Sequence, residues 1–225
     1  MPHFNIVRNV DIDNTFRVSR IMSDFDVALD HVQSKFEGDL NVPDKWQIGL
    51  IVGNSGTGKS TIMNELFNGD NSRFEYTHKS VIDDMPKDIP VDDIYKMFYS
   101  VGFGSMPCWL KPYHVLSNGE KMRVDLARAL LSNDLCVFDE FTSVVDRNVA
   151  HAMCIALKKC LSVYPNKQFV AVTCHKDVEA YLQPDWVFNT DTMQMSFQSA
   201  HVHKNNLLLK GATEKSGQSL GIITI

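Results

Sequence analysis

The sequence predicts an α/β protein with a mostly parallel central sheet flanked by helices. Three observations lead to this expectation. Short, nearly all-apolar runs alternate with longer helical patterns along most of the chain. Such runs are typical of strands that helices cover on both faces. One run leads into a glycine-rich loop, and another ends in two acids.

The segments follow one another in a regular order. We expect short strands within residues 16–27, where apolar and polar residues alternate, and then a turn-rich approach through Glu37-Gly38 and residues 41–44. Further buried strands are expected at 47–52, 135–138, 168–173 and 186–189, and helices at 59–67, 91–101, 120–131, 148–161 and 177–182. The tail from His201 to Ile225 breaks this pattern, and we expect a peripheral hairpin or a partly ordered arm there.

Composition restricts the class of protein. The 225 residues are 44% hydrophobic, with a formal net charge of −5, which argues against a surface built to coat nucleic acid. No repeat or linker divides the chain, so one domain over 1–225 is expected, with a helical lobe at about 75–130. Five cysteines without a C-x-x-C pair, a polar N-terminus and no apolar run near the about 20 residues of a membrane span predict a cytoplasmic protein.

A phosphate-binding loop follows the strand at 47–52. The residues match G-x-x-x-x-G-K-[ST] at every fixed position, and a predicted helix follows. Backbone amides of such a loop point at phosphate, the lysine binds the β- and γ-phosphates, and the hydroxyl binds Mg²⁺. We therefore expect ATP and Mg²⁺ as cofactors. The loop residues expected to bind nucleotide are Gly53, Asn54, Ser55, Gly56, Thr57, Gly58, Lys59, Ser60 and Thr61.

Two acids end the strand at 135–138. Asp139 is expected to bind Mg²⁺ together with Ser60, and Glu140 to act as the general base that polarises the attacking water. Alone, an apolar run that ends in Asp-Glu is common, because strands often end in exposed acids. The phosphate loop earlier in the chain favours the catalytic interpretation.

A third motif indicates a family. The residues Leu116-Ser117-Asn118-Gly119-Glu120 precede a strong helix pattern and resemble the LSGGQ signature of ABC-type ATPases, with Asp139 following Ser117 by 22 residues, as in that family. The resemblance implies a P-loop NTPase of ABC type with a small antiparallel β part. It also implies that Ser117 and Gly119 of a second copy bind the γ-phosphate. The same residues also fit an N-capped helix, with Ser117 and Glu120 as a capping box.

Two further elements appear in the order of that family. Residues 143–146 are similar to its D-loop, in which Asp146 is expected to reach the opposite subunit. His175 follows the buried strand at 168–173 and looks like the histidine that contacts the γ-phosphate in this family. A lone histidine is more often structural, but this one occurs within a series of matching motifs.

The sequence also departs from the transporter branch of this family. No glutamine lies between Phe67 and Leu116, where transporter-type domains have one on a loop. Asp83 is the candidate to reach Mg²⁺ in its place, although a solvated acidic turn fits equally well. Phe25, with Phe16 second, is the candidate for the aromatic ring that stacks on adenine; either residue could also be part of the core.

A narrower resemblance covers residues 16–189. The stretches 108–120 and 139–147, with Thr173-Cys174-His175 and residues 183–187, look like ABC-type ATPases that are fused to, or lie beside, a predicted GNAT-type acetyltransferase. That resemblance implies a stand-alone ATPase with an acetyltransferase partner in trans.

Three functions compete at this point. The first is a soluble ATPase with a DNA-related task, in which ATP closes a dimer of two copies; the second is the ATP-binding subunit of a membrane transporter; the third is a module that only holds ATP. The basic residues and the His201–His203 pair of the tail suit a solvated face better than a metal or DNA site. Ser60, Asp139, Glu140 and His175 count against the third function.

Overall fold

A five-stranded sheet forms the centre of the computed structural model, which describes residues 3–9, 13, 15–27 and 33–197. The strand order is β4-β5-β3-β6-β7. β4 (Leu135–Phe138), β5 (Gln168–Thr173), β3 (Ile48–Val52) and β6 (Trp186–Asn189) are mutually parallel, and β7 (Gln194–Phe197) is antiparallel to β6. The predicted α/β fold with a mostly parallel sheet is therefore confirmed.

Helices cover both faces of this sheet. Successive side chains of the central strand, β3, point to opposite faces, so β3 contributes to the apolar core on each side. Leu50 of β3 belongs to the apolar cluster that includes residues of α5 (Asn118–Ser132) and α6 (Arg147–Val163). Ile51 belongs to the opposite cluster, which includes residues of α2 (Lys59–Phe67). Both side chains are fully buried, so β3 is held from both faces.

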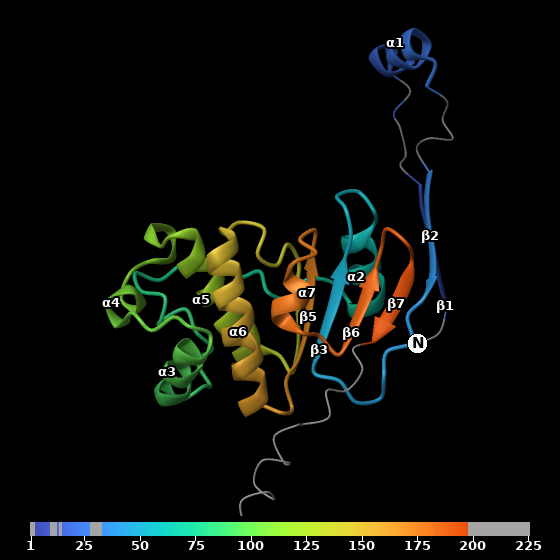
Figure 1. Cartoon of the computed structure of the whole chain (residues 1–225). Coiled ribbons are helices and arrows are strands. Elements are labelled where there is room, and N and C mark those ends of the chain that lie inside the picture. Colours follow the sequence, from blue (N-terminus) through green and yellow to red (C-terminus); the bar gives the residue numbers. More distant parts are fainter. Residues whose placement is uncertain (1–2, 10–12, 14, 28–32, 198–225) are drawn as a thin grey trace, which may run out of the picture.

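A separate two-stranded ribbon lies beside this sheet (Figure 1). β1 (His3–Asn9) pairs antiparallel with β2 (Gln33–Asp39). The ribbon is fixed to the sheet by Phe4, whose ring packs edge-on against Phe188 of β6 at 5.8 Å between centroids. This ribbon is the small antiparallel β part of the fold.

The strands expected within residues 16–27 are wrong, because this segment forms helix α1 (Phe16–Phe25). Its apolar residues Val18, Ile21, Met22 and Phe25 recur at three- and four-residue intervals, which is helical spacing. The Thr15 hydroxyl accepts a hydrogen bond from the amide of Val18 at 3.3 Å and so caps the helix. The outer strands of this region are β1 and β2 instead, and Glu37-Gly38 belongs to β2 rather than to a turn.

The predicted helices of the remaining chain are confirmed, with shifted ends. Helix α5 begins at Asn118 rather than at 120. The bounds of α6 and of α7 (Val178–Leu182) lie within one or two residues of the prediction. Between α2 and α5 lie α3 (Val91–Ser100), α4 (Met106–Trp109) and a 3₁₀ turn (Tyr113–Val115).

These helices gather at the end of the sheet beyond α6 (Figure 1). Trp109 is buried there, and its indole N–H donates to the carbonyl of Phe103 at 2.8 Å. The ring also contacts Tyr95, Phe98 and Tyr99, so Trp109 packs the lobe. Among the described residues, no helix has both the length and the apolar character needed to cross a membrane. The tail at 201–225, with its two histidines, lies outside the described residues.

Candidate functional site

The phosphate loop connects the end of β3 to the start of α2, as the sequence predicts. Gly58 immediately precedes the helix with φ +87°, a left-handed conformation that side chains other than glycine rarely adopt. A Cβ atom there would also lie 2.3 Å from the ring of Phe36 on β2. Both the backbone angle and this close approach require glycine at the last turn of the loop.

Hydrogen bonds hold the loop in shape. The Lys59 ammonium donates to the carbonyl of Asn54 at 2.7 Å, and the Thr57 hydroxyl donates to the same carbonyl at 2.8 Å. The amide of Asn54 donates to the carboxylate of Asp191 at 2.8 Å. This bond lowers the pKa of Asp191, and Lys176 contributes to the same effect through an ion pair at 3.0 Å. The loop is therefore preformed, with its lysine folded back over it.

The two predicted magnesium ligands touch each other. The Ser60 hydroxyl donates to the Asp139 carboxylate at 2.8 Å, although the two residues are 79 positions apart in the sequence. The other Asp139 oxygen accepts from the amide of Glu140 at 2.9 Å. A hydroxyl and a carboxylate at one edge fit Mg²⁺, which takes a few oxygen ligands from protein and keeps several waters.

Glu140 has an unusual backbone conformation. Its φ is +55°, and that of Thr142 is +67°, so the chain turns sharply directly after the acid pair. The amide of Phe141 donates to the carbonyl of Val172 at 2.8 Å, which ties this turn to β5. The turn therefore fixes the backbone of Glu140 at the carboxyl edge of the sheet.

His175 follows β5 at the same edge. Its amide donates to the Thr173 hydroxyl at 3.2 Å, and the residue is half-buried. Because β4, β5 and β3 are adjacent and parallel, their carboxyl ends lie side by side. The structure thus brings Lys59, Asp139, Glu140 and His175 to one edge of the sheet.

The signature residues form the N-terminal cap of α5. The Ser117 hydroxyl and amide both donate to one oxygen of Glu120, at 2.7 and 2.8 Å, and the Glu120 amide donates back to the hydroxyl at 3.4 Å. Hydrogen bonds from the Cys108 thiol and from Ser117 lower the pKa of Glu120 to about 2. The predicted capping box is confirmed, and its carboxylate is ionised at neutral pH.

Asp146 caps the next helix. Its carboxylate accepts from the amides of Asn148 and Val149, both at 3.0 Å, at the start of α6. In this single chain the side chain is therefore occupied by its own helix. Any contact of Asp146 with another subunit stays a prediction.

Three predicted residues are not brought to this edge. Phe25 and Phe16 lie on α1, with 71% and 82% of their surface exposed, beyond the end of the ribbon (Figure 1). Asp83 lies on a turn, accepts a hydrogen bond from Ser80, and lines a pocket that does not include Asp139 or Glu140. The geometry supports the solvated-turn interpretation of Asp83.

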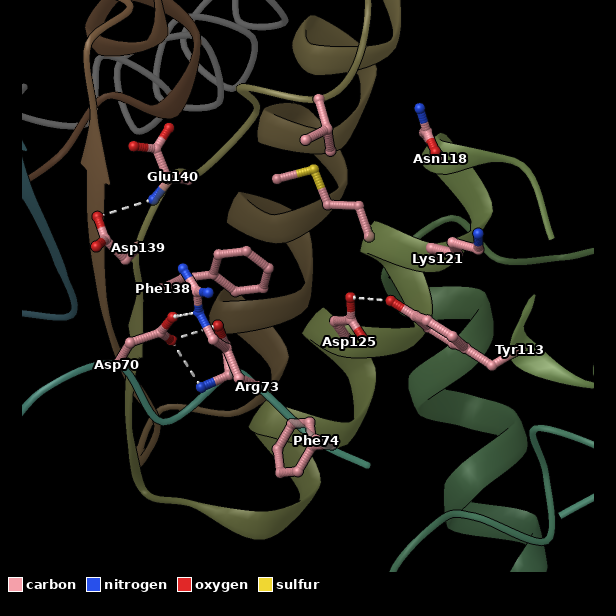
Figure 2. Close-up of a pocket in the computed structure, with 13 residues that line it drawn as sticks. Asp70, Arg73, Phe74, Tyr113, Asn118, Lys121, Asp125, Phe138, Asp139 and Glu140 are labelled. Carbon is pink, nitrogen blue, oxygen red and sulfur yellow. Dashed lines mark hydrogen bonds and ion pairs between the residues drawn. The ribbon is translucent and has the colours of Figure 1, made fainter. Parts of the chain in front are cut away.

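A cavity of about 480 Å³ opens beside the acid pair. Figure 2 shows Asp139 and Glu140 on one side of it and Asn118 and Lys121, from the first turn of α5, on the other. Asp70 and Arg73, which the sequence analysis did not single out, also line the cavity. The space therefore separates the acids of the sheet from the signature helix of the same chain.

Asp125 of α5 also lines this cavity. It accepts hydrogen bonds from the hydroxyls of Tyr76 at 2.8 Å and Tyr113 at 2.7 Å, and the two tyrosine rings stack at 3.9 Å between centroids. Burial raises the pKa of Asp125 to about 6, against the lowering effect of these hydrogen bonds and of Arg128. The carboxylate thus changes charge near neutral pH.

The free energy of unfolding is expected to depend on pH through the protonation of Asp125. A pKa higher in the folded chain than in the unfolded chain stabilises the fold at low pH, and this contribution disappears as the pH rises towards 6 and above. From pH 7 to pH 5, the wild type should gain about 1 kcal/mol of unfolding free energy relative to Asp125→Asn. Urea unfolding of both proteins at the two pH values measures this difference. An unchanged difference would show that Asp125 titrates as in the unfolded chain.

Comparison with known proteins supplies the fold family. No protein-family model matches the chain, and no curated protein matches it. Among solved structures, the dimeric structure of MJ0796, a bacterial ABC transporter cassette, is 16% identical, with a TM-score of 0.52 over 69% of this chain and 87% of that one. An inward-facing structure of a putative metal-chelate type ABC transporter is 18% identical, with a TM-score of 0.54 over 73% and 76%.

The chain has the ABC ATPase cassette fold. The predicted fold class is thereby confirmed to the level of this family of folds. Within this fold, the acid pair and the start of α5 line one cavity, and the phosphate loop contacts the acid pair through Ser60 and Asp139.

Two further residues near the loop escaped the sequence analysis. Phe36 lies directly before the turn-forming pair Glu37-Gly38, and its alternation with Lys35 and Glu37 is the signal that identifies a strand there. Asp191 follows the last parallel strand as a single exposed acid, and no motif singles it out. Their contacts with the loop appear only in the fold, where the Phe36 ring lies against Gly58 and Asp191 accepts from the amide of Asn54.

Proposed function

We propose that this chain is an ABC-type ATPase that binds Mg-ATP at the loop of one copy and hydrolyses it when a second copy closes over the nucleotide. The observation that supports this most directly is the 2.8 Å contact between Ser60 and Asp139, with Lys59 and Glu140 on the same edge. A chance glycine-rich turn would not place a hydroxyl, an acid pair and a lysine together.

The residues have distinct roles in this proposal. The amides of the loop and the N-terminus of α2 bind the phosphates, and Lys59 exchanges the carbonyl of Asn54 for phosphate oxygens. Ser60 and Asp139 hold Mg²⁺, which supplies charge neutralisation on the phosphates when bound. Glu140 accepts a proton from the attacking water, and His175 hydrogen-bonds the γ-phosphate.

The base of the nucleotide requires an aromatic partner. Phe36 packs on Gly58 at the end of the loop, whereas Phe25 lies on α1. We assign the stacking role to Phe36, because its ring lies against Gly58 of the phosphate loop.

The second copy completes the site. Ser117 and Gly119 flank Asn118 at the N-terminus of α5, and Figure 2 shows Asn118 across the cavity from the acids of its own chain. In a dimer Ser117 and Gly119 meet the γ-phosphate of the partner, and the positive end of the helix favours that negative charge. Asp146 lies at the start of α6 and contacts the partner in the same arrangement.

The proposal predicts ATP hydrolysis that depends on Mg²⁺. Purified protein should release phosphate from ATP, and EDTA in excess over Mg²⁺ should abolish the release, because Ser60 and Asp139 are expected to hold the ion. Restoring Mg²⁺ should restore the rate. Phosphate release that continues in EDTA, or no release at any protein concentration with Mg²⁺, would contradict the proposal.

For the task coupled to hydrolysis, we propose a role on DNA, in repair, modification or mobile-element biology. Glu120 in place of the signature glutamine and the missing loop glutamine support this more than the transporter alternative. An acetyltransferase supplied in trans is the protein partner implied by the family resemblance. Stimulation of hydrolysis by double-stranded DNA tests the role; no stimulation, together with co-purification with a membrane protein, would favour the transporter.

A further inference from the structure

An arginine lies on the same cavity wall as the acid pair. Arg73 lines the 480 Å³ cavity together with Asp139 and Glu140. Figure 2 shows its guanidinium group extending along Phe138 towards the two acids. The negative charges of Asp139 and Glu140 contribute to raising the pKa of Arg73, after the larger effect of Asp70. The arginine is thus within electrostatic reach of the groups proposed to act on ATP.

Asp70, which Ser72 holds in turn, sets the position of the Arg73 side chain. Its Nε donates to the Asp70 carboxylate at 2.7 Å, and the side chain of Asp70 is only 11% exposed. The other Asp70 oxygen accepts from both the amide and the hydroxyl of Ser72, at 2.9 and 2.5 Å. A carboxylate fixed by two hydrogen bonds from Ser72 holds the guanidinium in a defined orientation.

The segment that carries Asp70 and Arg73 is hydrogen-bonded to β4, the strand that ends in Asp139 and Glu140. The Asn71 side chain donates to the carbonyl of Leu135 and accepts from the amide of Val137, both at 2.8 Å. The amide of Asn71 also donates to the carbonyl of Val137 at 3.1 Å. Arg73 and the acid pair are therefore placed by one strand, β4, and keep their relative position.

The chemistry of the guanidinium suits a phosphoryl group. Arginine stays charged, and its planar fork of N–H donors matches the oxygens of a phosphate. The bond to Asp70 uses Nε, and the side chain of Arg73 is 72% exposed at the cavity. The terminal nitrogens are therefore accessible to a ligand that enters the cavity beside Asp139 and Glu140.

We propose that Arg73 is a catalytic residue of this chain, contacting an oxygen of the γ-phosphoryl group during its transfer to water. The inference rests on the proposed function. Water attacks the γ-phosphorus, its proton passes to Glu140, the bond to the bridging oxygen breaks, and ADP leaves with the electron pair. Arg73 stabilises the charge on the transferred group from within the same chain, and Asp70 is its positioning residue.

Substitution of Arg73 tests the role. Arg73→Ala should lower kcat about 10²–10³-fold while the affinity for ATP changes less than about threefold, because the contact forms with the transferring group. Arg73→Lys should recover only part of the rate, since a lysine keeps the charge and loses the fork. ADP with aluminium fluoride, a transition-state analogue, should be trapped by the wild type and not by Arg73→Ala, and guanidinium ion should partly restore the rate of Arg73→Ala.

Arg20→Ala is the matched control. Arg20 forms an ion pair with Asp24 at 2.6 Å on helix α1. The substitution therefore removes an arginine from a similar ion pair that lies away from the cavity. The kcat of this variant should equal that of the wild type. A hydrolysing wild type together with a wild-type kcat in Arg73→Ala, or an equal loss of ATP affinity and kcat, would overturn the role of Arg73. A wild type that does not hydrolyse ATP would instead overturn the proposed function.

Discussion

Glu140→Gln should bind ATP and accumulate as a dimer. The glutamine keeps the size of the side chain and cannot accept the proton of the attacking water, so hydrolysis should fall at least about 100-fold. Lys59, Ser60 and Asp139 are unchanged, so nucleotide binding persists. Because hydrolysis is what reopens the closed pair in the proposed mechanism, the closed form should build up.

Size-exclusion chromatography with light scattering measures this directly. With ATP and Mg²⁺ the variant should elute at twice the mass of the monomer, and with ADP as a monomer. Glu65→Gln, which removes the same charge from an exposed position on α2, should behave as the wild type. The double variant Glu140→Gln with Ser117→Ala should lose much of the dimer, because Ser117 is proposed to bind the partner's nucleotide. A Glu140→Gln protein that stays monomeric with ATP would refute the shared site or require a different partner subunit.

Lys59→Ala should abolish hydrolysis through loss of ATP binding. The ammonium is proposed to make charge-assisted hydrogen bonds to the β- and γ-phosphates, and bonds of this kind contribute about 1.5–3 kcal/mol each. The affinity for ATP should therefore fall about 10–100-fold or more. Fluorescence titration with a labelled ATP analogue measures the dissociation constant.

The folded state should survive this substitution. In the free chain the Lys59 ammonium bonds to the carbonyl of Asn54 within its own loop, and Thr57 donates to the same carbonyl. The substitution removes only one of these two bonds from the free chain, so the melting temperature should change little. Lys45→Ala, which removes an exposed lysine before β3, is the control with unchanged affinity. Equal ATP binding by Lys59→Ala and the wild type would show that the loop does not hold the phosphates.

Most of the parallel sheet could be predicted from the sequence, because its strands are continuous apolar runs with distinct ends. The same is true of α5, whose capping box at Ser117 is a local pattern. The outer ribbon could not, since β1 and β2 are polar on one side and pair only with each other. Helix α1 could not be predicted either, because residues 16–27 show both short apolar-polar alternation and the three-residue spacing of Val18 and Ile21.

The site divides in the same way. Residues within motifs, such as Lys59 and Asp139, could be placed because their spacing to a strand end is fixed. Asp70, Arg73 and Phe36 could not, since each reaches the site through contacts with a distant strand: Asn71 beside Leu135, or Phe36 over Gly58. The position of Asp83 in the sequence could not place it either, because Asp83 lines a different pocket from Asp139 and Glu140.

The capping box of α5 has a consequence for how firmly two copies can hold each other. In the free chain the Ser117 hydroxyl already has a charged acceptor, the Glu120 carboxylate at 2.7 Å. A γ-phosphate arriving from a partner therefore replaces one anion by another, and the net gain is the difference between two similar bonds. The remaining carboxylate repels the phosphate. In the proposed dimer, the bond from Ser117 therefore adds little net free energy to closure, and we expect the two copies to separate readily once the γ-phosphate has been cleaved.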